Sequence, residues 1–180
     1  MKSISYAALA ILFSVTALSG QATQQTPQAP STLPGGATQV QETHGDWRVT
    51  CAQPGGRKVC TLSQQLSDPN SRQLVIGIEL KAMTSDKADG TMVMPFGLAV
   101  DKPVSLQVDD SGPAMTRTFR TCVPIGCLVD VTLDGTTLAA LKKGKALHVK
   151  ALADGGKETA FNISLNGFGS ALERTAALSK

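Results

Sequence analysis

The chain has 180 residues, of which 42% are hydrophobic and 17% charged, and its formal net charge is +3 at pH 7. This length fits one folded domain. The charge is too small to indicate a nucleic-acid-binding protein, so we expect no nucleic-acid partner.

Residues 1–22 have the pattern of a secretory signal peptide. Lys2 forms a short positive region, Ile4 to Leu18 form an apolar run, and Gly20-Gln21-Ala22 fits a small-residue cleavage site. The alternative is an N-terminal membrane anchor, for which the apolar run is short. Position 21 is not the cysteine that lipidation needs. We therefore expect a periplasmic protein, or an outer-membrane-associated or secreted one, that is not a lipoprotein.

Residues 23–43 are rich in Gln, Thr, Pro and Gly and carry no charge before Glu42. Such a composition buries too little apolar surface to order itself, which predicts a disordered linker. The folded domain is then expected at residues 44–178, with no membrane span after cleavage of the signal peptide.

Short apolar runs separated by turn residues follow along the folded part. The expected strands are Trp47–Cys51, Val59–Leu66, Leu74–Leu80, Thr91–Met94, Val104–Val108, Thr116–Thr121, Leu128–Leu133, Ala146–Leu152 and Thr159–Leu165. A polar loop is expected at Asp86–Gly90 and a turn at Asp109–Pro113. This spacing predicts an all-β fold, an antiparallel β-sandwich or barrel-like domain.

Two short helices interrupt the strand pattern. Asp134 can cap a helix that ends at Gly144, with Lys142 and Lys143 in its last turn, where cations complement the helix dipole. A second helix is expected from about Ser170 to Leu178.

The four cysteines are Cys51, Cys60, Cys122 and Cys127. An even number in an exported chain indicates disulfides, and four cysteines allow three connectivities. Local turn signals favour Cys51–Cys60 and Cys122–Cys127, and each bond would contribute about 2–3 kcal/mol. A zinc site and a thiol redox pair at Cys122 and Cys127 are the alternatives. Neither pair has the C-x2-C spacing that those sites use.

Catalytic patterns are absent from the sequence. His44 and His148 are isolated, the adjacent Asp109 and Asp110 belong to a turn sequence, and no G-x-S-x-G or phosphate-binding glycine motif occurs. We therefore expect a non-enzymatic protein without cofactor or metal.

A group of lysines could form an anion-binding patch, for lipid headgroups or a sulfated surface. Its members are Lys142, Lys143, Lys145, Lys150 and Lys157, and a solvated surface is the alternative. Beyond residue 22 the aromatic residues are Trp47, Phe96, Phe119, Phe161 and Phe168, and four of these five are expected in the core.

Several of these motifs together resemble the invasion-associated locus B family. The matching stretches are His44–Cys51 (H-G-D-W-R-V-T-C), Cys60 with Gln64-Gln65, Met94–Leu98 (M-P-F-G-L), Val108–Asp110, Phe119–Cys127 (F-R-T-C-V-P-I-G-C), Leu138–Gly144 and Ser164–Phe168. The resemblance covers about residues 44–173. It implies an exported, β-rich protein of the bacterial envelope, linked in some intracellular pathogens to host-cell invasion, and it carries over no catalytic residue.

The resulting hypothesis is an envelope protein that binds a protein or another envelope or host-surface component. The alternatives are a surface invasion factor that contacts host cells and a periplasmic thiol redox enzyme that uses Cys122 and Cys127. The sequence does not identify the partner or the oligomeric state.

Overall fold

A computed structural model describes residues 31–84, 86–110 and 112–180. The predicted signal peptide and residues 23–30 of the predicted linker lie outside the described residues. The strands are β1 (Gln39–His44), β2 (Trp47–Ala52), β3 (Val59–Ser67), β4 (Leu74–Thr84), β5 (Lys87–Met94), β6 (Val104–Val108), β7 (Ala114–Arg117), β8 (Phe119–Val123), β9 (Gly126–Leu133), β10 (Ala146–Leu152) and β11 (Glu158–Ser164), and the α-helices are α1 (Gly135–Lys143) and α2 (Phe168–Leu178). Short 3-10 turns lie at Pro34–Gly36 (η1) and Pro54–Gly56 (η2).

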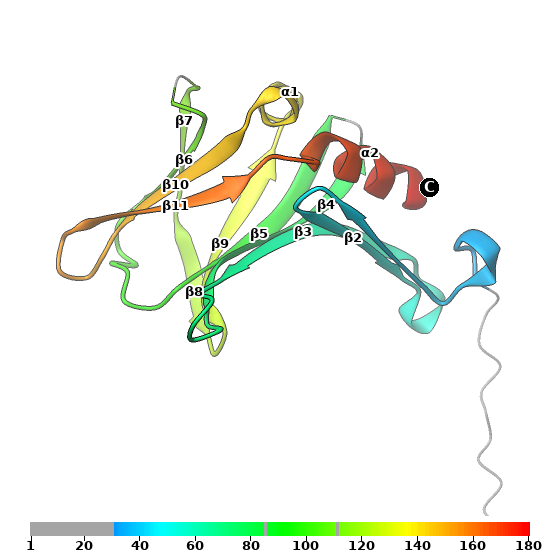
Figure 1. The fold of residues 1–180 in the computed structure, drawn as a ribbon, viewed down its shortest axis with the longest axis horizontal. Coiled ribbons are helices and arrows are strands. Elements are labelled where there is room, and N and C mark those ends of the chain that lie inside the picture. Colours follow the sequence, from blue (N-terminus) through cyan, green and yellow to red (C-terminus); the bar gives the residue numbers. More distant parts are fainter. Residues whose placement is uncertain (1–30, 85, 111) are drawn as a thin grey trace, which may run out of the picture.

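These strands form two antiparallel sheets (Figure 1). Within the described residues, the larger sheet has seven strands in the order β1-β2-β3-β4-β5-β9-β8, and the smaller has four in the order β11-β10-β6-β7. The predicted all-β antiparallel fold, with two short helices and two disulfides, is confirmed.

One face of the seven-stranded sheet carries the core. The paired positions Val49, Leu62, Leu80, Gly90 and Val131 form one row across β2, β3, β4, β5 and β9, and the side chains in it are buried. They join one hydrophobic cluster with side chains of α2 and of the four-stranded sheet. Both elements therefore cover this same face.

The opposite face of the seven-stranded sheet is polar. Because side chains alternate along a strand, the next row points away from the core. It consists of Arg48, Ser63, Glu79, Thr91 and Asp130, paired in that order. Figure 1 shows that the sheet is curved, with this uncovered face on the concave side.

The helix α2 packs over β2, β3 and β4 through Phe168 and Leu172, which are buried. The ring of Phe168 lies edge-on to Trp47, with ring centroids 5.0 Å apart. Gly167 precedes the helix at φ 83°, and a side chain there would collide with the His44 carbonyl. Glycine thus lets the start of α2 approach the end of β1.

The helix α1 follows its predicted boundaries. The Asp134 carboxylate accepts a hydrogen bond from the Thr137 backbone N–H at 2.7 Å, which is the expected cap. The helix α2 begins two residues before the predicted start at Ser170.

Three parts of the structure predicted from the sequence are wrong. The linker was expected to reach residue 43, but Gln39–His44 pair with β2 as the edge strand β1, and Leu33 is buried. The domain therefore begins before residue 44. The expected polar loop Asp86–Gly90 is mostly part of β5, where buried Ala88 alternates with outward Lys87 and Asp89.

The third error concerns the expected strand Thr116–Thr121. The chain bends at Thr118, so β7 joins the four-stranded sheet and β8 the seven-stranded sheet. Composition could not reveal this bend, because both halves remain extended.

Candidate functional site

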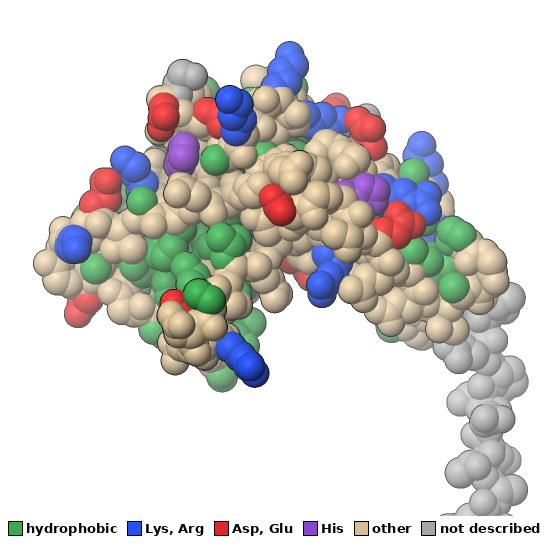
Figure 2. All heavy atoms as spheres, viewed as in Figure 1, with side chains coloured by type: hydrophobic (Ala, Val, Ile, Leu, Met, Phe, Trp, Pro, Cys, Tyr) green, Lys and Arg blue, Asp and Glu red, His purple; other side chains and the backbone are tan. Residues whose placement is uncertain are grey.

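Three separate segments meet at one end of the curved sheet and line an open cavity of about 720 Å³. They are the β3–β4 turn, the residues that follow β5, and the β8–β9 turn. We call this cavity the tip groove; its lining residues are Gln65, Ser67, Arg72, Gln73, Leu74, Pro95, Phe96, Pro124 and Ile125. In Figure 2 this end projects below the sheet and carries exposed hydrophobic side chains beside a basic one.

Two large apolar side chains of the tip groove are exposed. Phe96 is 61% exposed and Ile125 is 66% exposed. Pro95 lacks the N–H that would continue the β5 ladder, so the chain leaves the sheet there and directs Phe96 outward. Of the other aromatic residues in the described part of the chain, Trp47, Phe161 and Phe168 are buried and Phe119 is partly buried, so Phe96 is the one of these that lies outside the core.

The β8–β9 turn that carries Pro124 and Ile125 is closed by a disulfide. Cys122 and Cys127 are paired residues of the two strands, with Cα atoms 3.9 Å apart. Gly126 has φ 144°, and a Cβ there would come within 2.5 Å of the Met94 carbonyl oxygen. Glycine and the disulfide thus hold this turn against the end of β5.

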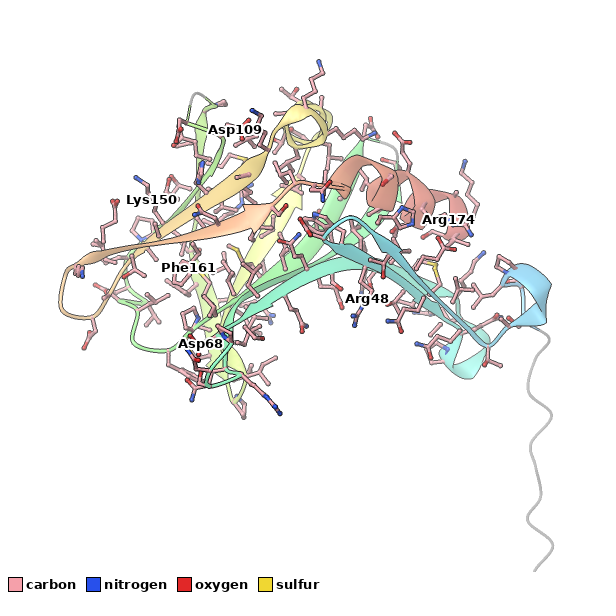
Figure 3. All side chains as sticks on the ribbon, viewed as in Figure 1. Arg48, Asp68, Asp109, Lys150, Phe161 and Arg174 are labelled. Atoms are coloured by element: carbon pink, nitrogen blue, oxygen red, sulfur yellow. A yellow bond between two sulfur atoms is a disulfide. The ribbon has the colours of Figure 1, made fainter. Side chains whose placement is uncertain are left out.

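The β3–β4 turn is organised by Asp68. Its carboxylate accepts hydrogen bonds from the backbone N–H groups of Asn70 and Ser71, at 3.0 and 2.7 Å, and from the Ser71 hydroxyl at 3.0 Å. The hydrogen bonds from Ser71 and Asn70 lower the pKa of Asp68. Figure 3 places Asp68 at this end of the molecule.

This turn holds Arg72 at φ 58°. For a residue with a Cβ, the left-handed region costs about 1 kcal/mol. The Arg72 backbone N–H donates to the Asp68 carbonyl at 2.8 Å, which closes the turn without using the arginine side chain.

A smaller polar hollow adjoins the tip groove on the concave face. It is lined by Asp46, Arg48, Ser63, Gln64, Gln65 and Ser67, and it shares Gln65 and Ser67 with the tip groove. Figure 3 shows Arg48 directed to the concave side. The adjacent glutamines have different roles, since Gln64 is buried and exchanges two hydrogen bonds with the Ser164 backbone.

The disulfide Cys51–Cys60 lies at the start of β3, whereas the tip groove lies at the opposite end of that strand. These cysteines are paired residues of β2 and β3, and they are 0% and 6% exposed. Both predicted disulfide pairings are therefore present. The alternative redox pair lacks support in the geometry, because Cys122 and Cys127 lie across a hairpin and not at the start of a helix.

His44 belongs to a polar cluster that the sequence did not reveal. Its Nε2 lies 3.2 Å from Glu42, and its Nδ1 lies 3.3 Å from the Ser170 hydroxyl oxygen. Arg174 donates to both Glu42 carboxylate oxygens, at 2.7 and 2.8 Å, and this contact lowers the Glu42 pKa to about 2. The Ser170 hydroxyl also donates to the Gly167 carbonyl at 3.0 Å.

A serine, a histidine and a carboxylate are the groups of a hydrolase triad, but their roles here differ. The arginine neutralises the carboxylate, and a backbone carbonyl accepts the serine proton. The cluster connects edge strand β1 to α2, as Figure 3 shows for Arg174. We interpret it as a structural connection.

The five lysines of the predicted anion-binding patch lie on different elements of the fold. Lys142 and Lys143 end α1, Lys145 follows it, Lys150 lies on β10, and Lys157 lies in the β10–β11 turn. Two of them pair with carboxylates: Lys142 with Glu173 and Lys150 with Glu158, both at 3.2 Å. Figure 3 shows Lys150 on the flank of the four-stranded sheet, away from α1.

Within the described residues, no group of three or more His, Cys, Asp or Glu side chains is arranged to hold a metal ion. In the same part of the chain, no helix is both long and apolar enough to cross a bilayer.

Comparison with known proteins gives a consistent result. The sequence pattern of the invasion associated locus B (IalB) protein family matches residues 47–176. An invasion protein B homologue from Brucella abortus (strain 2308) is 41% identical over 177 residues, which are 97% of this chain and 98% of that protein. Invasion protein B from Bartonella bacilliformis is 35% identical over 158 residues, 86% of this chain and 84% of that protein.

A crystal structure of the invasion associated protein B from Bartonella henselae has a similar fold. Its TM-score is 0.72 at 34% identity, covering 77% of this chain and 96% of that one. These proteins are described as invasion proteins and not as members of an enzyme family.

Proposed function

This chain belongs to the invasion associated locus B family, and from that premise we propose that it is an exported, non-enzymatic protein that binds another protein through the tip groove. The partner is a component of the bacterial envelope or of a host surface.

The observation that carries this proposal is the exposure of Phe96 and Ile125, which both line a 720 Å³ cavity. Covering apolar surface contributes about 25 cal/mol per Å², so two large exposed apolar side chains that line one cavity favour a surface that a partner covers. The turn that carries Ile125 is closed by a disulfide, and Asp68 fixes the β3–β4 turn that lines the same cavity. A rigid apolar surface loses little conformational entropy on binding.

Export is supported by the predicted signal peptide and by the two disulfides, which form in oxidising compartments. The test is intact-mass analysis of the protein purified from the producing cells. We expect a chain that begins at Thr23 and has four thiols protected from alkylation before reduction. A full-length chain with alkylated thiols would contradict export.

Binding can be tested by photo-crosslinking in living cells. The photoreactive residue benzoylphenylalanine replaces Phe96 in one variant and Ala139, an exposed residue of α1, in the control. We expect a discrete crosslinked protein from position 96 that is absent from position 139. It should also be lost when Ile125→Ser is added to the position 96 variant.

Equal labelling from both positions, or persistence of the product in the presence of Ile125→Ser, would overturn this function. So would a turnover activity of the purified protein that is lost on His148→Ala.

A surface invasion factor is the second candidate, because the relatives are named invasion proteins. That role requires the chain to be outside the cell. Protease treatment of intact cells should then remove it, whereas complete protection would restrict the partner to the envelope interior.

A further inference from the structure

The tip groove carries positive charge. Among the described residues that line it, Arg72 alone is charged, and no described carboxylate pairs with its guanidinium. The other polar lining groups are the amides of Gln65 and Gln73 and the Ser67 hydroxyl. The groove therefore complements an anion that lies next to apolar groups.

The backbone at Arg72 indicates that its side chain has a use beyond the fold. Among described non-glycine residues, Arg72 and Asp109 have positive φ, 58° and 49°. At Asp109 the strain has an internal reason, because its carboxylate accepts the N–H groups of Lys145 and Ala146 at 2.9 and 3.0 Å. The Arg72 side chain makes no such hydrogen bond within the described chain.

Asparagine or glycine would close the same turn with less strain, since the Asp68 contacts do not involve the side chain at position 72. An unfavourable conformation that supports no internal contact is typical of a functional position.

We propose that the tip groove binds an extended acidic peptide segment of the partner protein. In it, an Asp or Glu carboxylate pairs with Arg72, and a neighbouring apolar side chain packs against Phe96 and Ile125. Guanidinium binds carboxylate through two parallel hydrogen bonds, which gives this contact direction as well as strength.

The segment is extended because the tip groove continues into the polar hollow. Gln65 and Ser67 line both, and Arg48 lies beyond them on the concave face. The one carboxylate that lines the hollow, Asp46, accepts a hydrogen bond from the Ser164 hydroxyl at 2.6 Å. This inference rests on the proposed function, since it specifies the occupant of the same groove.

The test uses the full mature chain and a phage-displayed library of random peptides. Panning against the wild type should enrich Asp or Glu adjacent to Phe, Leu or Ile. The enriched peptide, synthesised with blocked ends, should bind Arg72→Asn about tenfold more weakly than wild type. Its acid-to-amide version should bind wild type about tenfold more weakly too, with no further loss on Arg72→Asn.

Arg57→Asn is the matched control, because Arg57 is also exposed and unpaired with any described carboxylate but lies at the other end of the sheet. It should leave peptide affinity unchanged. Asparagine tolerates positive φ, so Arg72→Asn should keep or raise the melting temperature while it weakens binding.

The outcomes separate the two proposals. Enriched peptides without acidic residues, which still depend on Phe96 but not on Arg72, would overturn the acidic-peptide inference and leave the binding function standing. Arg72-dependent binding to vesicles of phosphatidylglycerol, without peptide binding, would also overturn it. Peptide binding that changes on substitution of neither Phe96 nor Arg72 would show that the peptide binds elsewhere, and it would contradict the proposal that the tip groove is the binding site.

Discussion

The seven-stranded sheet carries a disulfide-linked hairpin near each end, and the two hairpins have different surroundings. At the β1–β3 end, Cys51 and Cys60 are buried in the core that α2 shares. At the β8–β9 end, Cys122 is exposed and Cys127 is buried but lies outside that hydrophobic cluster, and the hairpin turn presents Ile125 to solvent. The same covalent bond joins directly paired residues in both places.

This difference indicates that the two disulfides serve different purposes. The first connects strands that are already held by buried side chains, so it adds to the stability of the core. The second joins an exposed to a buried cysteine outside that cluster, and it fixes the shape of the tip groove. We therefore expect stability to depend mainly on the β1–β3 end, and binding on the β8–β9 end.

The largest effect should come from removing the buried disulfide. Cys51→Ala with Cys60→Ala removes a crosslink between residues separated by 9 in sequence and also removes two buried sulfur atoms. We expect a loss of about 3 kcal/mol or more in the free energy of unfolding, measured by urea denaturation. If this loss were smaller than the loss on removing the Cys122–Cys127 disulfide, the expected difference between the two ends would be reversed.

Cys122→Ala with Cys127→Ala should lower the free energy of unfolding less than removal of Cys51–Cys60 does, and it should weaken partner binding more. The sequence separation is 5, for which the chain-entropy estimate is about 2 kcal/mol. Because the β8–β9 turn carries Pro124 and Ile125, its release should weaken partner binding, measured by the crosslinking yield from position 96. The Cys51–Cys60 variant, studied at a temperature where it remains folded, is the control and should keep its crosslinking yield.

The same contrast explains how much could be predicted from the sequence. The disulfide pairings, most strands and α1 follow from local signals: turn residues between cysteines, alternation of apolar residues, and a capping Asp134. These features depend on residues that are close in sequence.

The tip groove could not be predicted in this way, because its lining comes from three segments that only the sheet brings together. Phe96 illustrates the difficulty, since an aromatic residue at the end of a strand run is usually part of the core. The only local signal was its position between Pro95 and Gly97, which form a turn rather than a continued strand. The strand β1 could not be predicted because its composition is polar. Its pairing with β2 holds it in the sheet all the same.

A smaller effect is expected at the contact between β1 and α2. Glu42→Gln removes the charge that Arg174 binds, and we expect a loss of about 1 kcal/mol in the free energy of unfolding at pH 7. The folded-state pKa of Glu42, about 2, lies below the usual value of 4.5. This contribution is therefore complete above about pH 4.5 and is lost as the pH falls toward about 2.

The measurement is the difference between wild type and Glu42→Gln in urea unfolding from pH 7 to pH 2. Glu158→Gln is the control, because its pair with Lys150 is largely exposed and should add nothing measurable. If the free energy of unfolding of wild type exceeded that of Glu42→Gln by the same amount at pH 2 as at pH 7, Glu42 would not act through its charge.

The smallest change in stability should follow the substitution that matters most for binding. Phe96→Ser alters a side chain that is 61% exposed, so we expect a change within about 0.5 kcal/mol in the free energy of unfolding. Phe168→Ala is the matched control at the other end of the sheet. That ring is 1% exposed and packs on Trp47, and its removal should cost about 3–5 kcal/mol.

Together the two phenylalanines test the division of roles directly. If Phe96→Ser destabilised the fold as much as Phe168→Ala, the exposed ring would be part of the core, and the tip groove would need no partner to explain it. If Phe96→Ser left stability intact but abolished partner capture, the aromatic side chain would be retained for a contact outside the chain. The covered end of the sheet would then supply the stability that lets the tip keep an apolar surface in solvent.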